Sequence, residues 1–250
     1  MKKFVFPSLL LLLAGCSFFK VTPKEPPPSK KPPSFDYRPP TEGVTRSNEI
    51  TFILLNPRYA EDFQSKTLPP YSTLVESMKG DFEEMLVARG YPYKGPYREY
   101  DEFVYSDKKN ADLILEAEVS YEFTGAQSAL KKEQKYDVVT KQYHYVYYYD
   151  GDVTLSGRIE LSASEPFTKT VVWRKSVPLS SETFRLRSYH KYDGIPPDDD
   201  PLIWNSIVSV LEEQYIKAMK TAWNHLEPEE LLVKKKEAEE IKERSGYSRD

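Results

Sequence analysis

The chain has 250 residues, of which 30% are charged and 39% hydrophobic, and its 35 basic and 39 acidic side chains give a formal net charge of −4. A nucleic-acid-binding surface needs a basic excess, so we do not expect nucleic acid as a partner. The chain has a single cysteine, Cys16. An intramolecular disulfide is therefore excluded, and this thiol must have another role.

The first sixteen residues have the order of a secretory signal. Two lysines precede an apolar stretch at residues 4–13 that is too short to span a bilayer as a helix. The sequence LAGC at residues 13–16 then resembles the lipobox of bacterial lipoproteins. That resemblance implies that residues 1–15 are removed and that Cys16 carries covalent lipid, the only bound group we expect. A buried core cysteine is the alternative, and the position within a signal argues against it.

The residues after the cysteine indicate a tether to a membrane. Ser17 stands where enteric lipoproteins carry an aspartate as a retention signal, so the resemblance favours the outer membrane, on either of its faces. Residues 16–47 are rich in proline, which favours an extended, solvated segment. This linker is either a semi-rigid stalk of up to roughly 100 Å or a disordered linker of no fixed length. Both alternatives predict a globular domain that begins near Asn48.

We expect residues 48–226 to form that globular domain. The apolar run Glu49–Leu55, ended by Asn56 and Pro57, predicts a short buried strand. Between Pro70 and Gly90, apolar residues recur at steps of three and four, which predicts an amphipathic helix that stops at the glycine. These positions are Leu74, Met78, Phe82, Met85 and Leu86.

Two later stretches, residues 112–124 and 152–164, alternate apolar and polar side chains, which predicts antiparallel strands with one wet face. Asp150-Gly151 predicts a turn before the second stretch, and Ser164-Glu165-Pro166 should end it. We expect a further strand through residues 169–177, and leave open another through 181–187.

A second amphipathic helix is expected from Pro201 to Leu226, followed by a charged helical tail at residues 227–250. In the tail, acids and bases at i,i+4 spacing are typical of a solvated helix. The order strand, helix, strands, helix predicts an α+β fold. It should consist of a mainly antiparallel sheet with two amphipathic helices packed on one face.

The usual catalytic and metal-binding motifs are missing from the sequence. His144, His190 and His225 have no partner at zinc-like spacing, and no nucleophile-elbow, phosphate-cradling or HExxH motif occurs. The acidic run Asp198–Asp200 could attract Ca²⁺. Three acids between prolines also fit a solvated loop that leads into a helix, so we expect no metal site. We therefore expect a protein that is not an enzyme.

The richest candidate site is a run of tyrosines at residues 136–150. A tyrosine ring with its hydroxyl suits sugars and protein interfaces, but aromatic residues also stabilise strands through cross-strand pairs. Both readings stay open. If the segment is a strand, its residues divide between two faces. One face would hold Tyr143, Tyr145, Tyr147 and Tyr149, and the other His144, Val146 and Tyr148.

A compact basic cluster immediately precedes the tyrosines, and we expect it to form a loop between two strands. It consists of Lys131, Lys132, Gln134 and Lys135. We take this cluster together with Tyr143, Tyr145 and Tyr147 as the candidate ligand-binding residues.

Several short stretches resemble one lipoprotein family in their order. They are the lipobox, ITFILLNPRY at 50–59, LVARGY at 86–91, ADLILEAEVSYEF at 111–123, LKKEQK at 130–135 and the C-terminal helix. The order resembles the neuraminyllactose-binding haemagglutinin (flagellar-sheath adhesin) lipoproteins of Helicobacter and relatives over about residues 48–245. The resemblance implies an outer-membrane lipoprotein that acts as a non-enzymatic, adhesin-like binding module.

In that family a short basic segment with a central glutamine was proposed to bind sialic acid, and the basic cluster occupies its position here. Lysines would attract the sialyl carboxylate, and the glutamine would reach a hydroxyl or N-acetyl group. This sequence departs from the pattern, because Glu133 stands inside the cluster and the bases are fewer. We therefore expect little sialic-acid binding.

A second interpretation fits the same architecture. A strand–helix–strands–helix domain on a lipid tether also resembles periplasm-facing accessory lipoproteins that dock on an envelope assembly or synthase complex. In both interpretations the lipid joins the protein to a membrane, and a protein or glycan is the partner of the domain.

Overall fold

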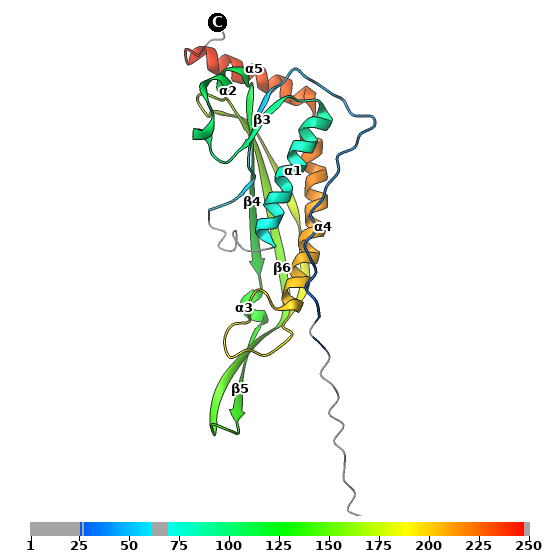
Figure 1. Cartoon of the computed structure of the whole chain (residues 1–250), viewed down its shortest axis with the longest axis vertical. Helices are drawn as coiled ribbons and strands as arrows, with labels where there is room; N and C mark the ends of the chain where they lie inside the picture. The colour runs from blue at the N-terminus through cyan, green and yellow to red at the C-terminus, as the bar shows by residue number, and fades with distance from the viewer. Residues whose placement is uncertain (1–25, 27, 62–69, 248–250) are drawn as a thin grey trace, which may run out of the picture.

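The computed structural model describes residues 26, 28–61 and 70–247, so the lipobox and Cys16 lie outside the described residues. Figure 1 shows an elongated molecule. Long strands run along its axis, helices α1 and α4 lie along one side of the sheet, strand β5 protrudes at one end and helix α5 crosses the other end. Within the described residues, no helix has the length and apolar character needed to cross a bilayer.

The structure is α+β, as predicted, with more elements than expected. In chain order these are β1 (Phe52–Leu55), β2 (Arg58–Tyr59), α1 (Tyr71–Arg89), β3 (Tyr93–Tyr97), the 3-10 helix η1 (Tyr100–Glu102), α2 (Tyr105–Asn110), β4 (Leu113–Thr124), α3 (Ala126–Ala129), β5 (Leu130–Asp137), β6 (Gln142–Ser164), β7 (Val171–Arg187), α4 (Pro201–His225) and α5 (Pro228–Arg244). The predicted order strand, helix, strands, helix is therefore incomplete, because it lacks the short elements; α5 corresponds to the helical tail that was predicted separately.

The sheet is mixed, so the expectation of a mainly antiparallel sheet is wrong. Its seven strands follow the order β3-β1-β4-β6-β5, with β2 beside β4 and β7 beside β6. Strand β1 pairs in parallel with β3 and β4, and β2 also pairs in parallel with β4. The β4–β6, β5–β6 and β6–β7 pairs are antiparallel. Strands β1, β2 and β3, which form the parallel pairs with one another or with β4, are too short to show a period in the sequence.

Strand β6 continues for 23 residues, through the predicted turn at Asp150-Gly151. That prediction is wrong for a packing reason. A Cβ atom on Gly151 would lie 2.9 Å from the Cα of Ala129, so glycine is needed because α3 crosses closely here. The strand ends at Ser164, as predicted. Strand β7 likewise runs unbroken over 17 residues, where one or two strands were expected.

Helices α1 and α4 cover one face of the sheet and share its main core. All five predicted apolar positions of α1 are buried, and they pack with α4 and with the inward residues of β4 and β6. The predicted end of α1 is confirmed. Gly90 adopts a left-handed conformation with φ of 81°, and its N–H donates to the last turn of the helix.

On the opposite face of the sheet, a smaller apolar cluster packs near β1. Ile53 and Ile114 pack there against Phe103 and Ala111, which flank α2. The face of residues 112–124 that was expected to be exposed to solvent is therefore buried at Ile114. It becomes polar farther along, where Glu118 forms an ion pair with Arg58 at 3.2 Å.

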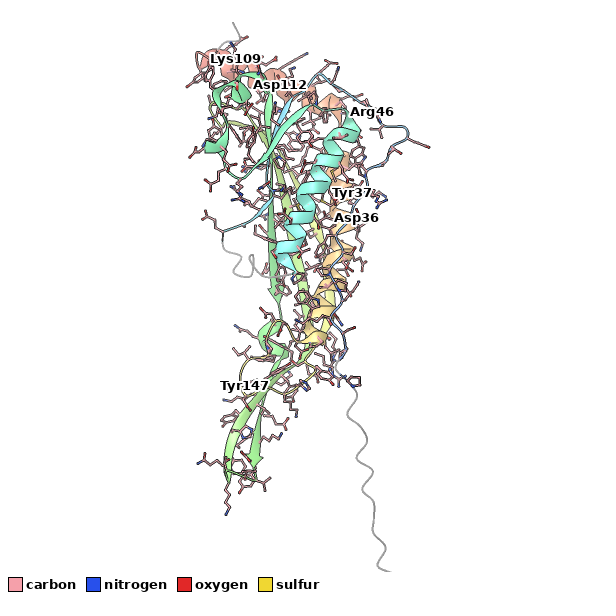
Figure 2. All side chains as sticks on the ribbon, in the orientation of Figure 1. Asp36, Tyr37, Arg46, Lys109, Asp112 and Tyr147 are labelled. Carbon is pink, nitrogen blue, oxygen red and sulfur yellow. The ribbon has the colours of Figure 1, made fainter. Side chains whose placement is uncertain are left out.

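Residues 28–37 of the predicted linker contact the domain. We call residues 28–37 the strap. Trp204 donates from its indole nitrogen to the carbonyl of Lys31 at 2.7 Å, and Phe35 and Tyr37 are only 6% and 8% exposed. Figure 2 places Asp36 and Tyr37 beside α1 and α4. The expectation of a solvated linker is therefore wrong at Phe35 and Tyr37, whose side chains complete the main core, whereas residues 29–32 of the strap are exposed, as expected.

The charged tail forms a helix, as predicted, but α5 is not fully solvated. Leu231 and Ala238 are buried in the main core. Lys242 donates from Nζ to the carbonyl of Lys109 at 3.0 Å, which joins α5 to the end of α2. One apolar stripe thus packs against the domain, and among the charged residues of α5 Lys242 is buried with it.

Asp81 connects the strap to both long helices. It is buried on α1 and accepts hydrogen bonds from the backbone N–H of Tyr37 at 2.9 Å and from the hydroxyl of Tyr215 on α4 at 2.5 Å. Burial raises the pKa of Asp81 above its ordinary value, and the two hydrogen bonds partly oppose this effect.

Replacing Asp81 by alanine should lower the free energy of unfolding by about 2–4 kcal/mol, because two buried donors lose their acceptor. Asp81→Asn keeps an acceptor and is the control. Because the folded-state pKa is raised, the wild type should lose stability relative to Asp81→Asn as pH rises from about 4 through that pKa. Urea unfolding across pH measures both effects. Equal stability of the alanine variant and wild type would contradict this role of Asp81.

Candidate functional site

The predicted tyrosine segment forms a protruding hairpin. Strand β5 pairs with the first part of β6. Leu130 lies opposite Tyr149 at the base of the hairpin, and Asp137 lies opposite Gln142 near its tip. We call residues 130–149 the tyrosine hairpin. Figure 1 shows that β5 extends beyond α3 and α4, and Figure 2 places Tyr147 on this protruding part, away from α1.

The register of the hairpin divides the candidate residues between two faces. Directly paired residues of an antiparallel ladder share a face. The tyrosine face therefore holds Lys132, Gln134, Tyr136, Tyr143, Tyr145 and Tyr147. The opposite face holds Lys131, Glu133, Lys135, His144, Val146 and Tyr148. The predicted division of the tyrosines is confirmed, but the basic cluster is a strand rather than a loop, and its lysines point in opposite directions.

Aromatic rings and one ammonium group lie close together on the tyrosine face. The Nζ of Lys132 is 3.8 Å from the ring centroid of Tyr145 and 5.7 Å from that of Tyr147. Nearer the tip, the rings of Tyr136 and Tyr143 are 5.0 Å apart. These contacts order the rings without burying them, since 67% of Tyr143 and 48% of Tyr145 stay exposed.

The opposite face is covered in part by the chain between β7 and α4. Lys191 forms an ion pair with Glu133, and His144 lies 3.7 Å from a carboxylate oxygen of Asp193. Tyr192 pairs with the free edge of β6, exchanging two backbone hydrogen bonds with Tyr147 at 2.7 and 2.8 Å. The tyrosine face is therefore the more open of the two.

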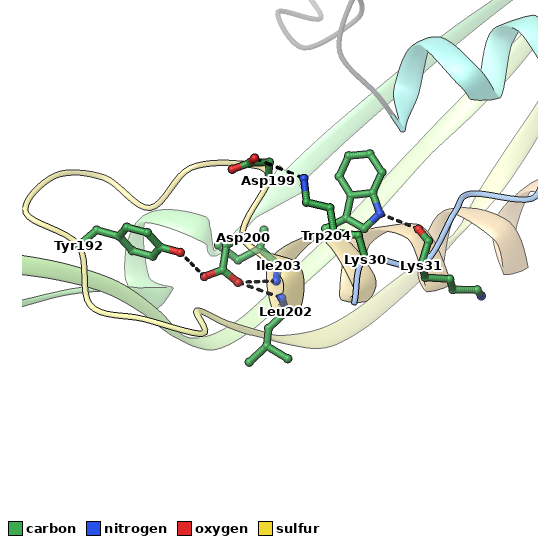
Figure 3. A network of polar contacts seen from close by, with 8 residues as sticks. All are labelled: Lys30, Lys31, Tyr192, Asp199, Asp200, Leu202, Ile203 and Trp204. Atoms are coloured by element: carbon green, nitrogen blue, oxygen red, sulfur yellow. Dashed lines mark hydrogen bonds and ion pairs between the residues drawn. The ribbon is translucent and has the colours of Figure 1, made fainter. Parts of the chain in front are cut away.

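A polar network at the start of α4 holds this covering loop (Figure 3). Asp200 caps the helix, accepting from the backbone N–H of Leu202 at 2.9 Å, and it also accepts from the Tyr192 hydroxyl at 2.7 Å and the Tyr189 N–H at 2.8 Å. Burial, together with the hydrogen bond to Asp200, raises the pKa of Tyr192 to about 12. The neighbouring Asp199 lies 3.3 Å from Lys30 of the strap.

An apolar cavity lies beside the base of the hairpin. Its volume is about 170 Å³, and its lining includes Tyr71, Phe123, Tyr149, Leu186, Ile203 and Trp204. Sites for small molecules usually enclose roughly 300–1,000 Å³. The volume of this cavity is thus below that range.

The tip of the hairpin carries two exposed valines, which the sequence patterns did not lead us to expect. Val138 and Val139 occupy the turn with 80% and 91% of their surface exposed. Asp137 shapes the turn by accepting from the backbone N–H of Val139 at 2.8 Å, and this bond lowers the pKa of the carboxyl. Two adjacent valines in a turn that is usually polar were the available signal.

The three histidines lie apart. His144 is on the hairpin, and His190 packs against Tyr189 at 4.1 Å between ring centroids. His225 ends α4, where burial and then the charge of Lys175 lower its pKa. Among residues 26, 28–61 and 70–247, no group of three or more histidine, cysteine or acidic side chains is placed to hold a metal ion.

Several solved bacterial structures are similar to this chain. A neuraminyllactose-binding hemagglutinin homolog from Helicobacter pylori aligns with 81% of this chain and 98% of its own, at 14% identity and a TM-score of 0.54. A protein from Xanthomonas campestris aligns with 78% of this chain and 89% of its own, at 10% identity and a TM-score of 0.32. A lipoprotein from Neisseria meningitidis aligns with 56% of this chain and 85% of its own, at 11% identity and a TM-score of 0.28.

The Helicobacter pylori structure shares the fold of this chain, as the sequence resemblance implied. At 14% identity the likeness concerns the fold alone. No family model and no curated protein matches the sequence.

Replacing Asp200 by alanine should destabilise the protein by about 2–4 kcal/mol, because α4 loses its cap and buried donors lose their acceptor. Asp199→Ala is the matched control, since it removes only an exposed ion pair and should change stability little. Urea unfolding of both variants measures the difference. Similar effects of the two changes would show that Asp200 neither caps α4 nor holds the covering loop.

Proposed function

We propose that this protein is a non-enzymatic binding lipoprotein of the cell envelope, held at the outer membrane by lipid on Cys16, and that the tyrosine hairpin is its binding surface. The single observation that carries the proposal is the open tyrosine face, which projects beyond the core with its rings exposed. Exposed aromatic surface of this kind is typical of recognition sites.

The arrangement of polar groups supports binding rather than catalysis. Catalysis needs titratable groups gathered within hydrogen-bond reach in a site that excludes water. Here the histidines lie on separate elements, and two of the buried carboxylates, Asp81 and Asp200, accept hydrogen bonds that hold the fold. The hairpin offers accessible rings and ammonium groups, which suit adhesion or docking.

A sialoglycan is the ligand that the family resemblance implies. The register of the hairpin favours the pairing of a lysine with a glutamine on one face, as that ligand would need. Lys132 and Gln134 share the tyrosine face, whereas Glu133 points to the opposite face and pairs with Lys191. The carboxylate inside the cluster therefore does not stand beside the ammonium of Lys132. The tyrosine face is open, however, and carries a single lysine.

We expect sialyllactose titrated into the protein to show no saturable binding, because one ammonium on an open face gives little attraction in water. Isothermal calorimetry measures it. Saturable heat that Lys132→Ala abolishes and Lys135→Ala leaves intact would contradict this expectation. The second variant is the matched control, since Lys135 lies on the opposite face.

The lipid anchor is tested on the mature protein isolated from its own cells. Mass spectrometry should find an N-terminal Cys16 with two or three acyl chains, enough to hold a protein stably at a membrane, and Cys16→Ser should release the protein from the membrane fraction. An unacylated wild type with residues 1–15 intact would overturn the proposal.

Protease treatment of intact cells distinguishes the adhesin-like placement from the accessory one. Removal of the domain indicates display on the cell surface. Protection until the outer membrane is opened indicates a periplasm-facing lipoprotein that docks on an envelope assembly.

A further inference from the structure

The strap and the hairpin meet at one end of the molecule. The carbonyl of Lys31 accepts from Trp204, and Lys30 lies 3.3 Å from Asp199, so the strap begins at the start of α4. Ile203, in the same turn, packs with Ala129 and Val153 at the base of the hairpin. Figure 1 shows β5 extending from this end, with α5 at the other. The lipid on Cys16 would therefore join the protein at the hairpin end.

Chain length keeps this end close to the bilayer. The residues from Cys16 to Lys30 can span at most about 50 Å when fully extended. The eight residues of β5 carry the hairpin tip roughly 27 Å from its base. A tether of that reach, fixed at the base, lets the tip touch the surface of the bilayer that holds the lipid.

The tip has the chemistry of a membrane-interface segment. Val138 and Val139 are its most exposed apolar residues, and the exposed ring of Tyr143 follows them. Tyrosine rings favour the level of the lipid headgroups, and short apolar side chains gain by leaving water there. Among residues 130–147 there are four lysines against two acidic residues, whereas the whole chain has a net charge of −4. The local excess favours anionic lipids.

From this placement and chemistry we infer that the hairpin tip, residues 136–145, rests in the headgroup layer of the anionic bilayer that carries the Cys16 lipid. This inference rests on the proposed lipid anchor, and it names the membrane as the partner of the tyrosine hairpin. The bilayer is favoured over a glycan or protein because the two valines offer no directional contact, and a fluid surface requires none.

The test uses the full acylated protein reconstituted in vesicles of phosphatidylethanolamine and phosphatidylglycerol. A fluorescent dye is attached to the new cysteine of Thr140→Cys, which reports on the tip and leaves both valines in place. Lipid on Cys16 blocks that thiol, so the dye reacts with the new cysteine alone. The matched reporter is Val233→Cys on α5, an exposed position at the other end. Spin-labelled headgroup lipids should quench the Thr140 reporter at least threefold more than the Val233 reporter.

Two further variants isolate the valines. In the Thr140→Cys background, changing Val138 and Val139 to aspartate should reduce the quenching to that of the Val233 reporter, and changing both to leucine should preserve it. Quenching that survives the aspartates would overturn the inference, because the dye rather than the hairpin would then be entering the lipid.

The outcomes separate this inference from the proposed function. If the protein floats with the vesicles but neither reporter is quenched, the anchor stands and the inference fails, leaving a glycan or protein for the hairpin. If the protein purified from cells carries no acyl mass and does not float, the proposed function itself fails.

Discussion

The continuous 23-residue strand β6 is the constraint on which the rest of the structure depends. Its first part pairs with β5 outside the core, and its remainder pairs with β4 and β7 inside it. Because side chains alternate along a strand, the register that turns Leu155 and Ile159 toward the helices also decides which tyrosines share a face. A slip of one residue would reverse both sets together.

Much of the fold could be predicted because several elements are buried on one side only. The five apolar positions of α1, the glycine that ends it, and the alternation of β4 and of the core part of β6 are all visible in the sequence. The parallel pairing of β1 was not, because four apolar residues carry no information about their neighbours. Asp150-Gly151 misled for a different reason. Glycine is required at position 151 because Ala129 lies too close for a side chain, and this contact exists only once α3 has folded.

The candidate site was predictable in part. The alternation of side chains along a strand was enough to place Tyr143, Tyr145 and Tyr147 on one face. The separation of Lys131 from Lys132 could not be foreseen, because it depends on their segment being a strand that pairs with β6. The packing of the strap could not be foreseen either. Its prolines predicted a solvated chain, but burial of Phe35 and Tyr37 fixes the strap on the domain. A few aromatic side chains can outweigh many prolines when a hydrophobic groove lies within reach.

The strap also decides how the protein would respond to force. A pull on the N-terminal side of the strap would not act on a loose loop, because the strap passes between α1 and α4 with Phe35 and Tyr37 buried in the main core. Tension would load these contacts in shear along α4, and tearing the strap free would open the main core to water. Detaching the strap and unfolding the main core would thus be one event, so a change that stabilises the core also raises the force needed to pull the strap away.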